Sequence, residues 1–280
     1  MTTHRFAGVC RGLACVAAFW IVSGGMVRAD GGGVGGLFSR SGEMPAGSGD
    51  RASRQAALTA LPTSRLVKSA ADEVLAIARR PTLYRKLPVQ AIQADADLFI
   101  FLTRRPEVLV GMWDLMDITN VKIQRRGPYE LQAVDGSGTT CTINLVYGDP
   151  NLHLYVAKGF YDGKLTTRPI RGSGVFLVRH VYGVDANGQP TVTGQLDCFL
   201  KLDSLGADLV ARTFGGLIGK SADHNFRETA GFVEQVSRAC RGNPEGMQNV
   251  AQRLPQVSEE TRSEFAGIID AVAAKPTTSR

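Results

Sequence analysis

Hydrophobic residues along the chain change from helical spacing to strand-like alternation and back again. Residues 57–80 carry apolar side chains at helical spacing, and Pro81 follows them. This pattern predicts an amphipathic helix that ends before the proline. The segment LPVQAIQ, residues 87–93, fits a short strand.

Residues 95–116 predict two short helices that meet at an angle. Asp95 or Asp97 can cap the first helix, because a carboxylate accepts the unpaired amides of a helix start. Pro106 is suited to the first turn of the second helix, where its missing N–H costs nothing.

Residues 119–203 alternate apolar and polar side chains in short runs separated by turn sequences. Asp135-Gly136 and Asn187-Gly188 are strong hairpin signals. Because no helical segment interrupts the series, we expect an antiparallel meander of about six strands. The alternation predicts one buried face and one solvated face.

Helical spacing returns over residues 205–242 and ends at Gly-Asn-Pro, a sequence typical of helix ends. Two shorter amphipathic segments follow, residues 245–254 and 257–274. We therefore expect one long helix and a helical extension after the meander.

The long helix contains a glycine-rich run, RTFGGLIGKSADHN (residues 212–225), whose Gly-Lys-Ser resembles the end of a phosphate-binding P-loop. A P-loop needs glycine five residues before Gly219, where this chain has Phe214, and it follows a buried strand. We therefore exclude nucleotide binding. Gly215 and Gly219 share one helix face, which indicates either tight packing on the sheet or a recess lining a cavity.

Residues 1–29 have the features of a secretory signal, with early arginines, a short apolar run and small residues before the cleavage point. We expect cleavage after Ala29 and export to the periplasm or the cell exterior. An uncleaved segment would instead associate the chain with a membrane. Residues 30–56 are rich in Gly, Ser and Ala and predict a flexible leader.

The composition, 44% hydrophobic and 21% charged, is that of a globular protein. Of the 32 Lys and Arg residues three lie in the signal, so its removal leaves 29 basic against 26 acidic residues, a net charge of +3. Arginine pairs at 79–80, 104–105 and 125–126 are isolated, and we interpret them as solvated faces. We expect no nucleic-acid partner.

Cysteine and histidine residues give no metal-binding spacing, and we expect no metal and no cofactor. In an oxidising compartment Cys141 and Cys198, which both face a core by strand parity, either form a disulfide or stay buried thiols. His180 alternates with Phe176, Val178 and Tyr182 and is interpreted as a core or rim histidine. No catalytic residue is assigned.

The order of elements resembles the START-like (helix-grip, SRPBCC) superfamily over about residues 85–242. The resemblance rests on RPEVLVGMWDLMDITNVKI leading into a strand and on LGADLVARTFGGLIGKSADHNFRETAGFVEQV as the closing helix. It implies an α+β fold in which a curved antiparallel sheet of six to seven strands wraps around a long C-terminal helix. The expected division is a signal (1–29), a leader (30–56), a helix (57–82), a START-like domain (83–242) and a helical extension (243–280).

The resemblance also implies an apolar ligand, such as a lipid, sterol or isoprenoid, between the sheet and the closing helix. The side chains expected to line this cavity are Trp113, Tyr147, Tyr155, His180, Tyr182, Phe199 and Phe214, with Gly215 and Gly219 thinning the helix. Two alternatives stay open. One is an enzyme of cyclase or hydrolase type that uses His180 or His224 as its acid-base group. The other is a protein-interaction module with a filled core.

Overall fold

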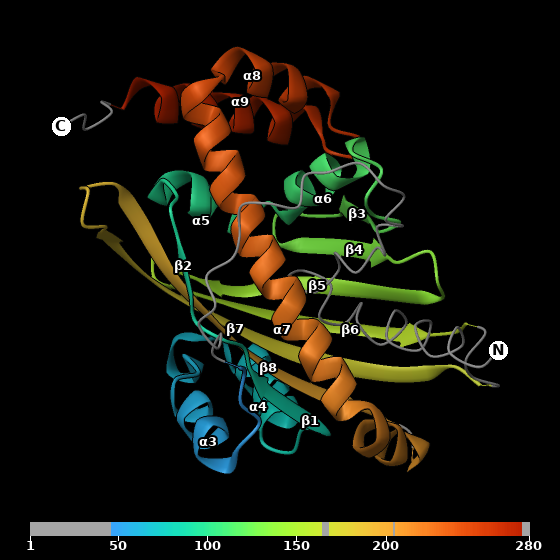
Figure 1. The fold of residues 1–280 in the computed structure, drawn as a ribbon. Helices are drawn as coiled ribbons and strands as arrows, with labels where there is room; N and C mark the ends of the chain where they lie inside the picture. The colour runs from blue at the N-terminus through green and yellow to red at the C-terminus, as the bar shows by residue number, and fades with distance from the viewer. Residues whose placement is uncertain (1–45, 164–167, 204, 276–280) are drawn as a thin grey trace, which may run out of the picture.

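The computed structural model describes residues 46–163, 168–203 and 205–275, with side chains of the long helix described from Ser221 onward. The chain forms an α+β fold, in which helices pack on both faces of one curved antiparallel sheet (Figure 1). The predicted fold class is confirmed.

The sheet contains eight strands in the order β1-β8-β7-β6-β5-β4-β3, with β2 also paired to β8. Their bounds are β1 (Leu83–Lys86), β2 (Gln90–Ile92), β3 (Lys122–Arg125), β4 (Glu130–Val134), β5 (Thr139–Gly148), β6 (Leu152–Tyr161), β7 (Ile170–Val184) and β8 (Pro190–Leu202). All pairings are antiparallel between neighbours in sequence from β3 to β8, so the predicted meander is confirmed.

Both predicted hairpin turns occur where the sequence places them. The carboxylate of Asp135 accepts the amides of Ser137 at 2.8 Å and Thr139 at 2.9 Å. Gly136 (φ 69°) and Gly188 (φ 74°) adopt the left-handed conformation that these turns require and that glycine tolerates at little cost.

The predicted helix pair consists of α5 (Ala96–Arg104) and α6 (Pro106–Leu115). Asp95 caps α5 by accepting the amides of Asp97 and Leu98. Pro106 occupies the first turn of α6, so the chain turns between the two helices as expected.

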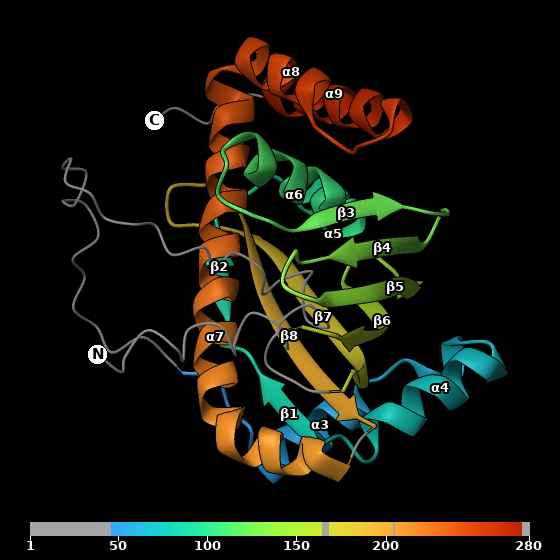
Figure 2. The same ribbon diagram turned by 90° about the vertical axis from the view of Figure 1, so that its right-hand side faces the viewer.

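The closing helix α7 (Leu205–Gly242) runs diagonally across the inner face of the sheet, and Figure 2 shows it standing to one side of the strands. After α7 the chain forms α8 (Pro244–Arg253) and α9 (Glu259–Ala274). Buried residues of α5 to α9 and of the inner sheet face form a single cluster, called here the inner cluster. The C-terminal helices thus share the core of the sheet domain.

The central part of the outer face of the sheet is also buried, which corrects the prediction of a solvated face for these strands, while Phe160 further along β6 is 42% exposed. Helices α3 (Arg51–Thr59) and α4 (Lys68–Ala78) cover it. Their apolar side chains form an outer cluster with alternate residues of the central strands: Leu154, Val156, Val175, Leu177 and Phe199. The reason is visible in β7, where Val175 to Val178 form an uninterrupted apolar run that suits burial on both faces.

Part of the expected leader belongs to the fold. Asp50 caps α3, so residues 51–56 are helical, and the backbone of Ser48 exchanges hydrogen bonds with Lys86. The amide of Gly47 donates to Asp223 of α7 at 2.8 Å. The single helix expected over residues 57–80 is divided into α3, a 3-10 turn (Thr63–Arg65) and α4.

The signal segment and residues 30–45 lie outside the described residues, so cleavage, export and membrane association stay predictions. No helix within the described ranges is long and apolar enough to cross a membrane.

The disulfide between Cys141 and Cys198 is ruled out by the sheet order. Cys141 lies on β5 and Cys198 on β8, with β6 and β7 between them. Three strand spacings amount to about 14 Å, whereas a disulfide needs α-carbons within about 7 Å. Both side chains are buried on the inner face, as parity predicted.

Candidate ligand-binding site

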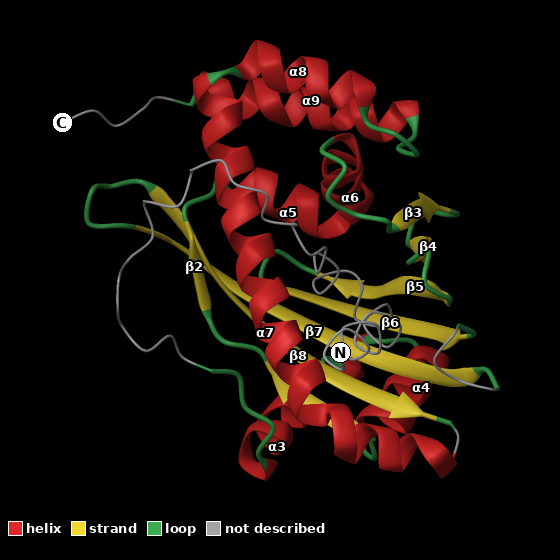
Figure 3. Ribbon diagram, turned by 45° about the vertical axis from the view of Figure 1, so that its right-hand side comes forward, coloured by secondary structure: helices red, strands yellow, loops and turns green. Residues whose placement is uncertain are grey.

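A cavity of about 420 Å³ lies where α5, the β3–β5 end of the sheet and α9 meet. Figure 3 shows α5 between the sheet and the α8–α9 pair. Its apolar walls are Ile100, Phe101, Leu131, Leu145 and Ile268, and its polar walls include Arg104, Arg105, Arg125, Tyr129, Tyr155, Asp97 and Glu264. The cavity therefore combines an apolar surface with several charges.

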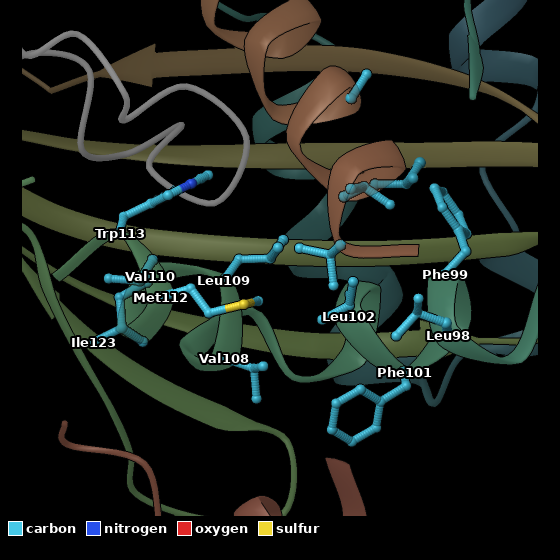
Figure 4. Close-up of a cluster of buried hydrophobic side chains, with 14 of the residues drawn as sticks. Leu98, Phe99, Phe101, Leu102, Val108, Leu109, Val110, Met112, Trp113 and Ile123 are labelled. Atoms are coloured by element: carbon cyan, nitrogen blue, oxygen red, sulfur yellow. The ribbon is translucent and has the colours of Figure 1, made fainter. Parts of the chain in front are cut away.

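Helix α5 positions one wall of the cavity. Ile100 and Phe101 lie four and three residues before Arg104, and all three side chains border the cavity. Phe99 points the opposite way (Figure 4) and meets His180 edge-on, with ring centroids 5.1 Å apart. Phe101 stacks on Phe265 of α9, with centroids 5.6 Å apart. The helix is thus fixed on both sides.

Arg125 and Glu107 form a buried ion pair beside the cavity. The two guanidinium nitrogens of Arg125 donate to Glu107 at 2.6 and 3.0 Å, and the Glu107 side chain is only 1% exposed. Arg125 also donates to the carbonyl oxygens of Arg104 and Pro128 at 2.9 Å each. It therefore links β3 to both helices of the α5–α6 pair.

Arg104 and Arg125 correct the interpretation of the arginine pairs as solvated faces. Arg79 and Arg80 are both exposed, as interpreted, whereas Arg125 is turned inward and its neighbour Arg126 is exposed. Arg105 binds Glu264 of α9 at 2.9 Å, and Arg104 reaches the inner face of the sheet. Arg125 faces the core and Arg126 does not, because neighbours on a strand point to opposite sides.

Behind Arg104 lies a pair of stacked histidines. The Nε of Arg104 donates to Nε2 of His153 at 2.9 Å, so His153 is neutral and carries its proton on Nδ1. His153 (0% exposed) and His180 (2% exposed) stack with ring centroids 5.3 Å apart. Nδ1 of His153 and both ring nitrogens of His180 make no hydrogen bond of regular geometry. The carbonyl of Pro150 lies beside His180 but already accepts the Tyr182 hydroxyl at 2.6 Å.

Burial lowers the pKa of both histidines. The pKa of His153 falls to about 3, first through burial and then through the neighbouring His180 and the positive charge of Arg104. Burial is also the main cause of the lowered pKa of His180. Both rings are therefore neutral at ordinary pH, and protonation would place a charge in the core.

These pKa shifts predict a protein that loses stability in mild acid. Unfolded histidine has a pKa near 6.5, so between pH 6.5 and 3 the unfolded chain binds a proton that folded His153 does not. The contribution of His153 to the free energy of unfolding is therefore fully present above pH 6.5 and is lost as the pH falls. Between pH 7 and pH 5 this group alone lowers the free energy of unfolding by about 2 kcal/mol. Urea unfolding at the two pH values measures the loss.

His153→Asn should reduce this acid loss, because asparagine can still accept from Arg104 but does not titrate. The matched control is His224→Asn, since His224 is exposed on α7. It should leave the pH dependence unchanged. Equal wild-type stability at pH 7 and pH 5, or the same reduction in both variants, would contradict the assignment.

The structure brings four of the expected ligand-lining residues to the inner side of the sheet. Tyr155 lines the cavity, and its hydroxyl donates to the carbonyl of Thr103 at 2.6 Å. His180 stacks on His153 and meets Tyr182 edge-on, and Trp113 packs on Phe232 of α7 at 5.7 Å. Only Tyr155 among these four borders the described cavity.

Tyr147 and Phe199 lie on the other side of the sheet, which corrects their assignment to the same cavity. Both belong to or pack against the outer cluster. Tyr147 binds Arg65 and Asp149 through its hydroxyl, and Phe199 packs on Tyr84 at 5.0 Å. The side chain of Phe214 and the surroundings of Gly215 and Gly219 lie outside the described side chains.

Sequence reasoning missed Arg104, Arg125, Glu107 and His153. One usable signal was parity, because His153 alternates with Tyr155 as His180 does with Tyr182. The pairing of Arg125 with Glu107 had no comparable signal. Within the described part of the chain, no group of three or more His, Cys, Asp or Glu could hold a metal ion.

No protein-family model and no curated protein matches the chain. Solved structures give weak similarities. An uncharacterized protein from Rhizobium leguminosarum is 17% identical with a TM-score of 0.29, covering 52% of this chain and 95% of that one. Ara h 8.0201 is 11% identical with a TM-score of 0.29, covering 52% and 99%. The di-domain ARO/CYC BexL of the BE-7585A pathway is 16% identical with a TM-score of 0.34, covering 68% and 59%. Similarities of this size carry no conclusion about ligand or activity.

Proposed function

We propose that the protein binds a small, largely apolar molecule in the cavity between α5, the β3–β5 end of the sheet and α9. The supporting observation is the cavity itself, whose volume of about 420 Å³ lies within the range of small-molecule sites, roughly 300–1,000 Å³. Its apolar walls come from two helices and two strands, so the ligand would contact several rigid elements. A START-like binding protein is the class that this arrangement favours.

The location differs from the one inferred from the sequence. The expected cavity lay beneath the closing helix α7, whereas the described cavity is bordered by α5 and α9. Helix α9 contributes Ile268 and Glu264, so the C-terminal helices form part of the proposed binding wall.

Binding is favoured over catalysis by the polar walls. The two carboxylates at the cavity are each engaged by a cation, Glu264 by Arg105 at 2.9 Å and Asp97 by Lys275 at 2.9 Å. His224, one of the two acid-base candidates, is exposed on α7 and does not border the cavity. Arginine is an unsuitable base because it stays protonated.

The test uses the neutral fluorophore N-phenylnaphthylamine, whose emission rises in apolar surroundings. We expect saturable binding by the purified chain, and a loss of at least about tenfold in affinity when Ile100→Trp fills the cavity. Ile100 is suited to this substitution because it is a partly exposed wall residue, so the added ring enters the cavity rather than the core.

Val67→Trp is the matched control, because Val67 is 73% exposed and lies outside the cavity walls. It should bind the fluorophore as the wild type does. Absence of saturable binding, or equal binding by Ile100→Trp and the wild type, would reject the proposed site.

A further inference from the structure

We infer that the ligand of this cavity is an organic acid, an apolar body with a carboxylate, sulfonate or phosphate group that binds the guanidinium of Arg104. This inference rests on the proposed function and names the class of molecule that the cavity selects. The support comes from the charges of the side chains around the cavity and from the contact that orients Arg104.

Among the described residues, Arg104 is the cavity arginine without a carboxylate partner. Arg125 is neutralised by Glu107 in a two-nitrogen contact, and Arg105 by Glu264 at 2.9 Å. Arg104 makes no ion pair within the described ranges, and its Nε donates to the neutral imidazole of His153. A positive charge therefore remains at a cavity that is otherwise paired or apolar.

The acids nearest in sequence do not supply the missing partner. Asp95 and Asp97 stand at the start of α5, and Lys275 binds them at 2.7 and 2.9 Å. Asp95 also caps α5. Arg104 lies seven or more residues further along the helix, which corresponds to about 10 Å of rise. The two ends of α5 thus carry opposite charges, and Asp97, which also borders the cavity, is already paired with Lys275.

The histidine pair fixes the direction of Arg104 without neutralising it. His153 accepts from Nε, so the two terminal nitrogens of the guanidinium are left for another acceptor. A planar guanidinium binds an acid group through two parallel hydrogen bonds, and prior orientation reduces the entropy lost on binding. His153 is buried behind Arg104 and stays neutral, so it does not compete as a negative partner.

The apolar part of the ligand has a defined place next to this charge. Ile100 and Phe101 precede Arg104 by one helical turn on the same face of α5. Leu145 stands directly opposite Tyr155 in the β5–β6 pair and borders the same cavity. An acid group on Arg104 would therefore direct the attached apolar body along α5 toward Ile100.

A matched pair of probes separates this inference from the proposed function. Anilinonaphthalenesulfonate is N-phenylnaphthylamine with an added sulfonate, so the two probes differ in the acid group. We expect the sulfonate to bind the wild-type chain at least about tenfold more tightly. Arg104→Gln should weaken the sulfonate by at least about tenfold while changing the neutral probe by less than about threefold.

Arg126→Gln is the control, because Arg126 is exposed, lies next to Arg125 and does not border the cavity. It removes the same net charge and should leave both affinities unchanged. If Arg104→Gln does not fold, displacement of the neutral probe from the wild type decides instead. Decanoate should then displace it at least about tenfold better than decanol of equal chain length.

The outcomes assign any failure to one of the two proposals. The inference is overturned if the wild-type chain binds the neutral probe and shows no preference for the acid. It is also overturned if both arginine variants weaken the binding of the sulfonate equally. Either result leaves the proposed function intact. Loss of all saturable binding, or binding of either probe that Ile100→Trp does not reduce, overturns the proposed function itself.

Discussion

Replacing Arg125 by alanine is expected to lower the free energy of unfolding by about 3–5 kcal/mol. The loss arises because Glu107, with a side chain 1% exposed, would be left in the core without its ionic partner. The carbonyl oxygens of Arg104 and Pro128 would also lose their donor. Urea denaturation followed by circular dichroism measures the effect.

Arg126→Ala is the matched control, because Arg126 is the exposed neighbour on the same segment and its side chain binds Gln132 on the adjacent strand. Its loss should stay within about 0.5 kcal/mol, as for most surface substitutions. Joint replacement by Arg125→Met and Glu107→Leu should recover much of the loss, because it removes both charges. Equal losses for the two arginine variants would show that the Glu107 pair does not stabilise the fold.

The elements that sequence predicted well are specified locally. Asp135-Gly136 determines its hairpin because the carboxylate binds amides two and four residues ahead and glycine accepts a positive φ. Pro106 begins α6 because its ring suits a first helical turn. Such features need no information about distant parts of the chain.

The faces of individual strand residues were predicted less well, for two different reasons. Tyr147 has the parity of Leu145, but a register shift between these residues aligns it with Leu154 and turns it to the outer face. Phe199 adjoins Cys198, so the parity that places Cys198 inside already placed Phe199 outside. A bulge cannot be read from alternation, whereas the assignment of Phe199 could have been avoided.

The charged part of the candidate site depends on tertiary packing. Arg104 and His153 are 49 residues apart, and their contact exists because α5 packs on β6 and β7 through Phe99 and Tyr155. Sequence shows two adjacent arginines but not which of them faces the sheet. The identity of the unpaired cation was therefore not predictable from the sequence.

Phe265→Ala is expected to cost about 3–5 kcal/mol of stability, although Phe265 lies in the segment expected to be an extension of the START-like domain. Its side chain is 0% exposed and stacks on Phe101 of α5 with an interplanar angle of 3°. Removing the ring leaves a cavity between α9 and α5 that their helical backbones cannot easily close. Phe160→Ala, at a side chain 42% exposed on β6, is the control and should cost less than about 1 kcal/mol.

The same experiment decides whether the C-terminal helices fold with the sheet. Because α9 and the sheet share the inner cluster, Phe265→Ala should shift one cooperative transition. Circular dichroism and the fluorescence of Trp113, the tryptophan outside residues 1–29, should move together. Trp113 is buried and packs on Phe232 of α7, so it reports on the packing of the closing helix. If the Trp113 transition is unchanged from the wild type, α9 unfolds separately from the sheet. Helix α9 would then not be a fixed wall of the cavity.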